Sequence, residues 1–260
     1  IRYFREETNS GVDRDFDKAV RYAEGDYCWL MTDDDLLCDG AIQKLLTEIN
    51  ENRDLIVVNA TVKNSDLTEI LEERRLKVSS DITYNDGDQE KLFSDAVSYM
   101  SFIGCIVIKR SHWNSRDKAS YFGTLFIHIG VIFQTPLLKT AIVLSEPLII
   151  IRYGNAMWTP RGFEIWMVKW PKLIWSFSDF SDDAKHNVCR PEPWRSATTL
   201  FFYRAMGSYS KDEFEQFLYK KSSGLRQCLV AYGIAFFPAK LANFILVLYF
   251  VIRPQNSWRH

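Results

Sequence analysis

Hydrophobic and polar positions alternate in two patterns over residues 1–153. Short, mostly apolar runs typical of buried strands occur at 27–31, 55–58, 103–108, 140–144 and 148–153. Between them lie stretches with helical spacing, whose apolar faces comprise Val12, Phe16, Ala19, Val20 and Ala23 in one case and Ile42, Leu45, Leu46 and Ile49 in another. A further helix is expected within 123–138. Strands that alternate with helices favour an α/β fold with a mainly parallel sheet.

The pattern changes after Tyr153, and we therefore predict two domains, 1–153 and 154–260. Spacing typical of strands fades in the second, and it contains a cluster of tryptophans: Trp158, Trp166, Trp170, Trp175 and Trp194. We expect most of them to pack against the α/β domain; stacking on sugar rings and an interfacial belt are the alternatives. Trp166 and Trp170 are four residues apart and would share one face of a helix.

Residues 228–252 are almost entirely apolar, and this stretch is long enough to cross a bilayer. Pro238 and Lys240 lie in its middle, where a proline breaks a helix and a charge is costly. We therefore expect two helices at a membrane interface, with Lys240 and Arg253 directed toward lipid headgroups. A membrane span and simple core packing are the alternatives, because apolar runs of this kind are ambiguous.

The charges of the chain balance, with 32 Lys and Arg against 33 Asp and Glu. This balance gives no support to a nucleic-acid binder that depends on a generally basic surface. The five cysteines are odd in number and lack CxxC spacing, so we predict neither a disulfide framework nor a thiolate zinc site. We expect the protein to reside in a reducing, cytosolic compartment. The chain opens at Ile1 within an apolar stub and without a signal peptide, and we expect that its true N-terminus is missing.

Three consecutive carboxylates, Asp33, Asp34 and Asp35, follow the apolar run 27–31. They are expected at the C-terminal end of a buried strand, where open α/β sheets bind their ligands. Like charges so close repel one another unless a cation neutralises them, and Mg²⁺ or Mn²⁺ with oxygen ligands does so. The alternative is a solvated acidic turn that leads into the next helix.

These residues also resemble a known family. In order along the chain come Asn9-Ser10-Gly11, Ala23-Glu24-Gly25-Asp26-Tyr27, an apolar strand and Thr32-Asp33-Asp34-Asp35. This order and spacing resemble the family 2 glycosyltransferases, whose GT-A fold has a Rossmann-like, mainly parallel sheet. Residues 101–104 and 123–128 resemble the abequosyltransferase-like branch that builds bacterial O-antigens. The resemblance covers about residues 1–153 and implies an N-terminally truncated GT-A domain followed by a helical, aromatic-rich extension.

The resemblance implies a nucleotide-sugar donor held through a divalent ion, Mg²⁺ or Mn²⁺, and inversion at the anomeric carbon. Asp34 matches the family carboxylate that contacts the metal, Asp33 matches its neighbour at the ribose or the metal, and Asp35 takes the last acidic position. Asn9, Gly11 and Asp13 match the loop beside the donor. The alternative interpretation is that Asn9-Ser10-Gly11 forms a plain turn and that Asp13 caps the helix that follows.

The sequence offers two candidates for the catalytic base. The family base is commonly an aspartate in a Glu-Asp pair at the start of a late helix, and the matching stretch here, 126–129, has no carboxylate. His128 is the natural substitute, because an imidazole can accept a proton from an attacking hydroxyl near neutral pH. There are two alternatives for His128. It could bind the metal or contact the acceptor, or it could be a buried structural histidine. Asp117 is the rival base.

The resemblance therefore implies a metal-dependent, inverting glycosyltransferase that extends a lipid-linked saccharide in O-antigen synthesis. We expect it to be peripheral on the cytoplasmic face of a bacterial membrane, with no nucleic-acid partner. Two alternatives are a sugar nucleotidyltransferase, which would release pyrophosphate, and a truncated domain that binds saccharide or a partner without turnover.

Overall fold

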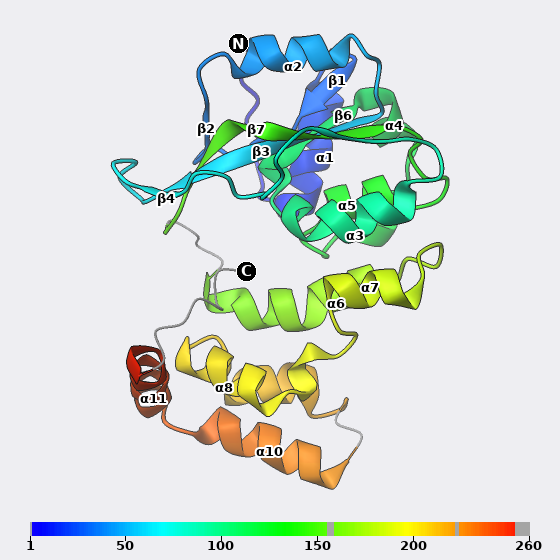
Figure 1. The fold of residues 1–260 in the computed structure, drawn as a ribbon. Helices are drawn as coiled ribbons and strands as arrows, with labels where there is room; N and C mark the ends of the chain where they lie inside the picture. The colour runs from blue at the N-terminus through cyan, green and yellow to red at the C-terminus, as the bar shows by residue number, and fades with distance from the viewer. Residues whose placement is uncertain (1, 155–158, 222–223, 253–260) are drawn as a thin grey trace. The chain divides into compact units, whose positions relative to one another are not determined.

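The structure is a computed structural model, and it describes residues 2–154, 159–221 and 224–252. Its contacts gather into two compact units (Figure 1). The first comprises Ile1–Ala156 and Ser176–Val188, and the second comprises Met157–Trp175 and Cys189–His260. The segment 176–188 thus packs with the first unit, a return that the predicted division at Tyr153 does not include. Trp158 and Arg253, both named in the sequence predictions, lie outside the described residues.

The first unit is built on one mixed sheet. Its central path runs β1-β6-β3-β7-β2, and β4 and β5 join β3 and β7 from off this path. The strands are β1 (Tyr27–Trp29), β2 (Leu36–Leu37), β3 (Leu55–Lys63), β4 (Ile70–Glu72), β5 (Ile82–Tyr84), β6 (Ile106–Lys109) and β7 (Ala141–Arg152). The strands of the long central pair, β3 and β7, carry mostly buried Ile, Leu and Val, which favour a pleated surface covered on both sides.

The α/β class is confirmed, but the prediction of a mainly parallel sheet is wrong. β3 and β7 pair in parallel, from Leu55 opposite Ala141 to Lys63 opposite Arg152. The other described pairings are antiparallel. Alternation of strands and helices predicts layers, but the direction of each strand depends on which end of the sheet its connection reaches. Here residues 64–105 bring the chain back so that β6 runs against β3.

Helices cover both sides of this sheet. Figure 1 shows α2 on one side of the sheet and α3 and α5 on the other. The helices of the first unit are α1 (Val12–Tyr22), α2 (Ala41–Ile49), α3 (Gln89–Met100), α4 (Arg110–Ser115), α5 (Ile127–Phe133) and α7 (Asp182–Val188), with 3-10 turns at Ile103–Cys105 and Ala119–Tyr121. Phe180, just before α7, stacks on Phe93 of α3 with ring centroids 4.2 Å apart, and this contact ties the segment 176–188 to the first unit.

The helix faces differ from the predicted ones. Helix α1 buries Asp13, Asp17 and Val20, while Val12 is 43% exposed. Helix α2 buries Ala41 and Leu45, while Ile42 and Leu46 are exposed. Apolar spacing therefore placed both helices in the sequence, but the side that faces the protein is rotated from the predicted one.

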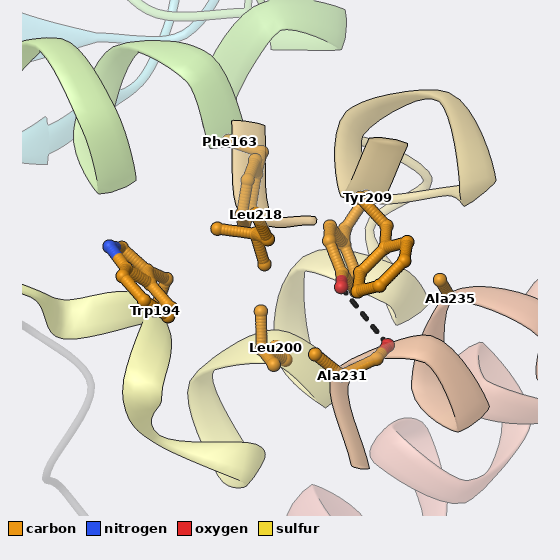
Figure 2. Packing of buried hydrophobic residues seen from close by; sticks show 8 residues of the cluster. Phe163, Trp194, Leu200, Tyr209, Leu218, Ala231 and Ala235 are labelled. Atoms are coloured by element: carbon orange, nitrogen blue, oxygen red, sulfur yellow. Dashed lines mark hydrogen bonds between the residues drawn. The ribbon is translucent and has the colours of Figure 1, made fainter. Parts of the chain in front are cut away.

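The second unit is a set of short helices around its own core. They are η3 (Thr159–Arg161), η4 (Glu164–Lys169), α6 (Trp170–Ile174), η5 (Pro193–Arg195), α8 (Ala197–Ala205), α9 (Lys211–Glu213), η6 (Phe214–Leu218), α10 (Leu225–Phe236) and α11 (Ala239–Ile252). The core gathers Phe163, Trp194, Leu200, Tyr209, Phe214, Leu218, Ala231 and Ala235. Figure 2 shows the Tyr209 hydroxyl within this core, where it donates a 3.0 Å hydrogen bond to the Ala231 carbonyl oxygen.

One tryptophan of this region belongs to that core, and two others pair with each other. Trp194 is a member of the second unit's own core, with 3% of its surface exposed. Trp166 and Trp170 share one side of their helical segment, as the four-residue spacing predicted, with ring centroids 5.9 Å apart.

The apolar C-terminal stretch forms two helices that meet at Pro238. No single helix among the described residues is long and apolar enough to cross a membrane, and α10 and α11 pass that test only as a pair bent by 95°. Both helices carry large exposed apolar side chains, namely Leu225, Leu229, Val230, Tyr232 and Phe236 on α10 and Leu241, Phe244, Ile245, Val247, Leu248, Tyr249, Val251 and Ile252 on α11. We call this set the apolar face of α10 and α11.

Candidate functional site

The acidic run lies in a turn between β1 and β2. Asp33 and Asp34 are exposed, and their carboxylates have no hydrogen bond or ion pair with other residues in the described ranges. Asp35 is 9% exposed, and its Oδ2 accepts a 2.5 Å hydrogen bond from the Thr32 hydroxyl. Burial raises the pKa of Asp35, and the neighbouring Asp34 adds to this effect. The three carboxylates therefore divide into two that face solvent and one that holds the turn.

This division bears on the predicted metal site. Across the described parts of the chain, no group of three or more His, Cys, Asp or Glu side chains is arranged to hold a metal ion. Two free carboxylates nevertheless fit what Mg²⁺ or Mn²⁺ takes from a protein, because such ions usually bind one or two carboxylates and complete their shell with phosphate oxygens and water. Asp33 and Asp34 could supply those ligands, whereas Asp35 is committed to Thr32.

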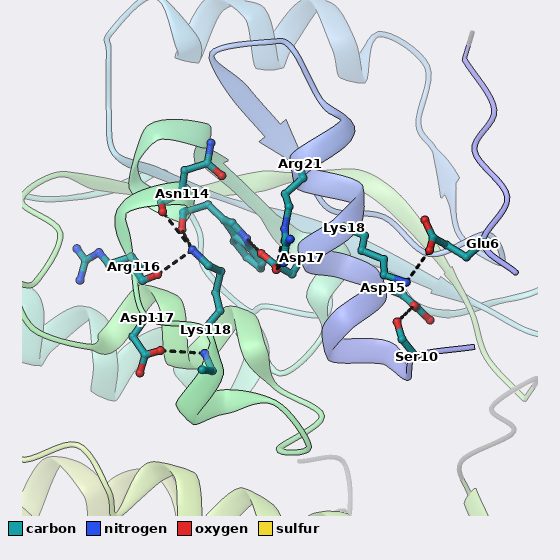
Figure 3. Close-up of polar contacts among 12 residues, drawn as sticks. Glu6, Ser10, Asp15, Asp17, Lys18, Arg21, Asn114, Arg116, Asp117 and Lys118 are labelled. Atoms are coloured by element: carbon teal, nitrogen blue, oxygen red, sulfur yellow. Dashed lines mark hydrogen bonds and ion pairs between the residues drawn. The ribbon is translucent and has the colours of Figure 1, made fainter. Parts of the chain in front are cut away.

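Asn9 and Gly11 form the turn that starts α1. The Asn9 Oδ1 accepts a 2.9 Å hydrogen bond from the Gly11 backbone N–H, and Gly11 has φ +88°, where an L side chain would be strained. Asn9 also lines a hollow of about 700 Å³ between the N-terminal segment and α1. On the same side of the helix, Figure 3 shows Ser10 donating to Asp15 and Lys18 paired with Glu6.

Asp13 has a different environment from the one predicted. It is 4% exposed, and its carboxylate accepts three backbone N–H groups from the loop before α5: Gly123 at 2.8 Å, Leu125 at 2.9 Å and Ile127 at 3.1 Å. Asp13 therefore does not cap its own helix. It caps the N-terminal end of α5 from a distance of more than 100 residues in sequence, and a donor-binding role for it stays a prediction.

Asp17 repeats this arrangement one turn later. It is 1% exposed, and its carboxylate accepts a 3.1 Å hydrogen bond from the Trp113 indole N–H of α4 and an ion pair from Arg21 (Figure 3). The sequence did not predict that Asp13 and Asp17 are buried and hold neighbouring segments in place. The available signal was the i, i+4 spacing of two carboxylates on a helix that buries one side.

His128 is buried in α5 with 2% of its surface exposed. Its Nε2 donates a 2.9 Å hydrogen bond to the Met100 carbonyl oxygen, and its Nδ1 is buried with no partner among the described residues. Burial lowers the pKa of His128 to about 4, so the ring is neutral near pH 7. This environment is that of a structural histidine, one of the three interpretations that the sequence left open.

Asp117, the rival base, is exposed at the start of the 3-10 turn Ala119–Tyr121. Its Oδ1 accepts a 2.8 Å hydrogen bond from the Ala119 backbone N–H (Figure 3). Hydrogen bonding with Ser120 lowers the pKa of this carboxyl, so it is ionised at neutral pH. The Gln134 side chain holds this loop through two hydrogen bonds. Its Oε1 accepts the Asp117 backbone N–H at 2.9 Å, and its Nε2 donates to the Asp117 carbonyl oxygen at 2.8 Å.

A third charged cluster lies at the opposite end of β3. Asp54 accepts hydrogen bonds from Lys109 Nζ at 3.0 Å, His112 Nε2 at 2.9 Å and the Lys139 backbone N–H at 3.0 Å. Burial opposes ionisation, but the hydrogen bonds of His112 and Lys109 outweigh it and lower the pKa of Asp54 to about 2. Because Asp54 precedes the first residue of β3, this cluster joins the starts of β3 and β7 and lies away from the acidic turn.

Sequence reasoning also missed two cations beside the acidic turn. Lys63 ends β3 and Arg152 ends β7, and the two residues are direct partners in the sheet. The backbone N–H of Arg152 lies near the Asp35 carboxylate and acts to lower its pKa, against the effect of burial. The acidic turn therefore lies next to the C-terminal end of β7, where Arg152 pairs with Lys63 of β3, and only the pairing of the strands reveals this.

Comparison with known proteins agrees with the motif pattern. Residues 1–116 match the family model described as glycosyl transferase family 2. The chain is 31% identical over 175 residues to the abequosyltransferase RfbV of Salmonella typhimurium, an alignment that covers 62% of this chain and 52% of that protein. The chain therefore spans about half the length of this relative.

Among solved structures, the crystal structure of residues 1–349 of S. aureus TarS aligns with a TM-score of 0.45 and 14% identity, over 88% of this chain and 61% of that one. The sequence relationship to the family model is independent of that alignment and covers the turn at Asn9, helix α1 and the acidic run. Residues 1–116 thus match the glycosyl transferase family 2 model, as the resemblance of the ordered motifs from Asn9 to Asp35 predicted.

Proposed function

We propose that this protein is a glycosyltransferase that moves a sugar from a nucleotide-sugar donor to a saccharide acceptor in bacterial O-antigen synthesis. The observation that carries the proposal is the family 2 match of residues 1–116, which includes the acidic run at the end of β1. The similarity to an abequosyltransferase supports the O-antigen pathway. In an open α/β sheet, ligands bind beyond the C-terminal ends of the strands, and we expect the nucleotide donor to bind there.

The proposal includes a divalent ion, Mg²⁺ or Mn²⁺, held by Asp33 and Asp34. When bound, such an ion supplies positive charge that offsets the charge developing on the departing phosphate. The Thr32 hydroxyl holds Asp35, which in turn fixes the turn that presents the two free carboxylates. Asn9 and Gly11 are proposed to contact the donor from the start of α1.

We further propose that transfer inverts the anomeric carbon, with one protein base on the acceptor side. Of the two predicted bases, Asp117 is the one that solvent and an acceptor can reach, and it is ionised at neutral pH. His128 is buried and hydrogen-bonded to Met100, which favours a structural role. Asp117 would accept the proton of the acceptor hydroxyl as its oxygen bonds to the anomeric carbon.

The acceptor is proposed to be lipid-linked, on the cytoplasmic face of the membrane. The apolar face of α10 and α11 supports this, because an exposed apolar surface of that extent marks an interaction site. The sequence segment that contains both helices carries one sign of charge: residues 216–260 contain Lys220, Lys221, Arg226, Lys240, Arg253 and Arg259 and no Asp or Glu. Basic residues beside an apolar face match an anionic lipid surface.

The function is tested with the full-length protein, a panel of nucleotide sugars and a lipid-linked saccharide acceptor. Metal-dependent release of a nucleoside diphosphate together with a glycosylated product is the expected result. The variant Asp34→Asn should lose this activity, and the matched surface variant Glu51→Gln should retain it. Release of pyrophosphate would instead indicate a nucleotidyltransferase, and saccharide binding without turnover would indicate a non-catalytic domain; either result overturns the proposal.

A further inference from the structure

The ends of the parallel strands β3 and β7 place two cations side by side. Lys63 and Arg152 are register partners, and the pairing continues through a 2.8 Å hydrogen bond from the Tyr153 backbone N–H to the Lys63 carbonyl oxygen. Register partners on neighbouring strands project to the same face, and the strands lie about 4.8 Å apart. Both side chains are partly buried. The lysine and the arginine therefore project from the same face of the sheet on neighbouring strands.

These two cations lack the partners that a structural pair would have. Neither side chain makes a hydrogen bond or an ion pair with any residue in the ranges that the structure describes, and the Nε of Arg152 is buried without a partner. Like charges opposite one another in a sheet are destabilising, and a buried guanidinium N–H without an acceptor adds to that cost. An anion bound between the two side chains removes both penalties.

The acidic turn lies beside these cations but does not neutralise them. β2 pairs with β7 through Leu36 opposite Ile150, two residues before Arg152, and the Arg152 backbone N–H reaches the Asp35 carboxylate. Yet Asp33 and Asp34 form no ion pair with Lys63 or Arg152, four residues that all lie in the described part of the chain. The carboxylates and the cations at this end of the sheet are thus not paired with each other. Such an arrangement suits an anionic ligand that contacts the two cations directly and reaches the carboxylates through a bound metal ion.

We propose that Lys63 and Arg152 bind the diphosphate of a nucleoside diphosphate, each contacting phosphate oxygens, and that this contact does not require a metal ion. The inference rests on the proposed function, in which that diphosphate is the leaving group. Arginine suits the task because its planar guanidinium can donate two parallel hydrogen bonds to one phosphate, while lysine acts as a point charge.

The electron balance of the transfer explains what the two cations do. The bond between the anomeric carbon and the terminal phosphate oxygen breaks, and its electron pair stays on that oxygen. The acceptor oxygen forms the new bond to the anomeric carbon, and its proton passes to the base. The leaving diphosphate therefore gains one negative charge, and positive groups already in place stabilise it without reorganisation.

The proposal is tested by calorimetric titration of UDP, CDP, GDP and inorganic pyrophosphate into the full-length protein, once in excess EDTA and once with Mn²⁺. The wild type should bind pyrophosphate and one nucleoside diphosphate in EDTA. Lys63→Gln and Arg152→Gln should each weaken that binding about tenfold to a hundredfold, as expected for the loss of charge-assisted hydrogen bonds. Arg152→Lys should recover part of the affinity.

Lys139→Gln is the matched control, because this exposed lysine precedes β7 at the opposite end of the same strand. It should bind like the wild type; an equal loss in Lys139→Gln would mean that only overall charge matters and would overturn the proposal. Circular dichroism confirms that each variant is folded, and Arg152→Lys with Lys63→Gln keeps the test decisive if Arg152→Gln unfolds.

The outcomes separate this inference from the proposed function. Unchanged affinity in Lys63→Gln and Arg152→Gln, while the wild type binds a nucleoside diphosphate, would overturn the inference and leave the transferase intact. Failure of the wild type to bind any nucleoside diphosphate, with or without Mn²⁺, would contradict the transferase. Pyrophosphate binding that is lost in the two variants would in that case still establish the anion site.

Discussion

The carboxylate of Asp13 accepts the backbone N–H of Leu125 at 2.9 Å, across 112 residues of sequence. Leu125 has φ +71°, a left-handed conformation that is strained for a leucine, and the same carboxylate also receives Gly123 and Ile127. The buried carboxylate thus holds in place a loop that the polypeptide would not adopt by itself. Helix α1, next to the proposed donor loop, is consequently joined to the loop before α5 by three hydrogen bonds.

Removal of this carboxylate should destabilise the first unit strongly. Asp13→Ala leaves three backbone N–H groups without their acceptor and frees the strained loop, so we expect a loss of about 3–5 kcal/mol in the free energy of unfolding. Urea denaturation followed by circular dichroism measures it. Asp15→Ala, on the exposed side of the same helix, should cost less than about 1 kcal/mol. Equal losses in the two variants would show that Asp13 does not hold the loop.

Protonation of His128 should make stability fall between pH 6.5 and pH 4. The pKa of His128 is lowered to about 4 in the folded protein, whereas in the unfolded chain it is near 6.5. Over this window the unfolded chain binds a proton that the folded protein does not, so acid favours unfolding, by up to about 3 kcal/mol at the lower end. Denaturation midpoints measured from pH 7.5 to pH 4.5 test this.

The variant His128→Gln is the control for that measurement. Glutamine can donate to the Met100 carbonyl oxygen but does not titrate, so its stability should vary less over the same pH range. A wild-type curve that stays parallel to the His128→Gln curve would contradict a buried neutral imidazole.

Asp54 should contribute to stability at neutral pH and lose that contribution in acid. Its pKa is lowered to about 2 in the folded protein from about 3.8 in the unfolded chain. The contribution is therefore complete above about pH 4 and is lost as the pH falls toward 2, with a size of about 2 kcal/mol. Asp54→Asn should remove it at pH 7, and Lys109→Gln should remove part of it. A variant as stable as the wild type at pH 7 would show that the cluster with Lys109 and His112 is not coupled to folding.

The apolar face of α10 and α11 should bind anionic membranes. Phe244 and Val251 are 58% and 69% exposed, and a charge at either position opposes insertion into the acyl boundary. The double variant with Phe244→Asp and Val251→Asp should lower co-sedimentation with phosphatidylglycerol-containing vesicles at least about tenfold. Each substitution puts a charge where the wild type would insert an apolar side chain into the membrane.

A matched control distinguishes this face from general stickiness. Leu71→Asp changes an exposed leucine of the first unit and should leave vesicle binding unchanged. Binding that persists in the double variant, or dimerisation that the same substitutions abolish, would assign the face to another partner.

The sequence predicted those features of the fold that depend on local periodicity. Apolar runs located β1, β3, β6 and β7, and helical spacing located α1, α2 and α5. The acidic motif was placed at the end of a strand because three carboxylates directly follow buried residues, and a break at Pro238 followed from its missing N–H. These signals belong to neighbouring residues, so no knowledge of the partner segments was needed.

The tertiary structure decided strand direction, the buried sides of α1 and α2, and the identity of the cations at the site. Periodicity assigned Val12 to the inside of α1, but the N–H groups of the loop before α5 and the Trp113 indole make Asp13 and Asp17 the buried pair. Lys63 and Arg152 are 89 positions apart in sequence and meet only because β3 and β7 pair in parallel. Burial and electrostatic partners depend on contacts between distant segments, and a linear pattern carries no information on which segments will meet.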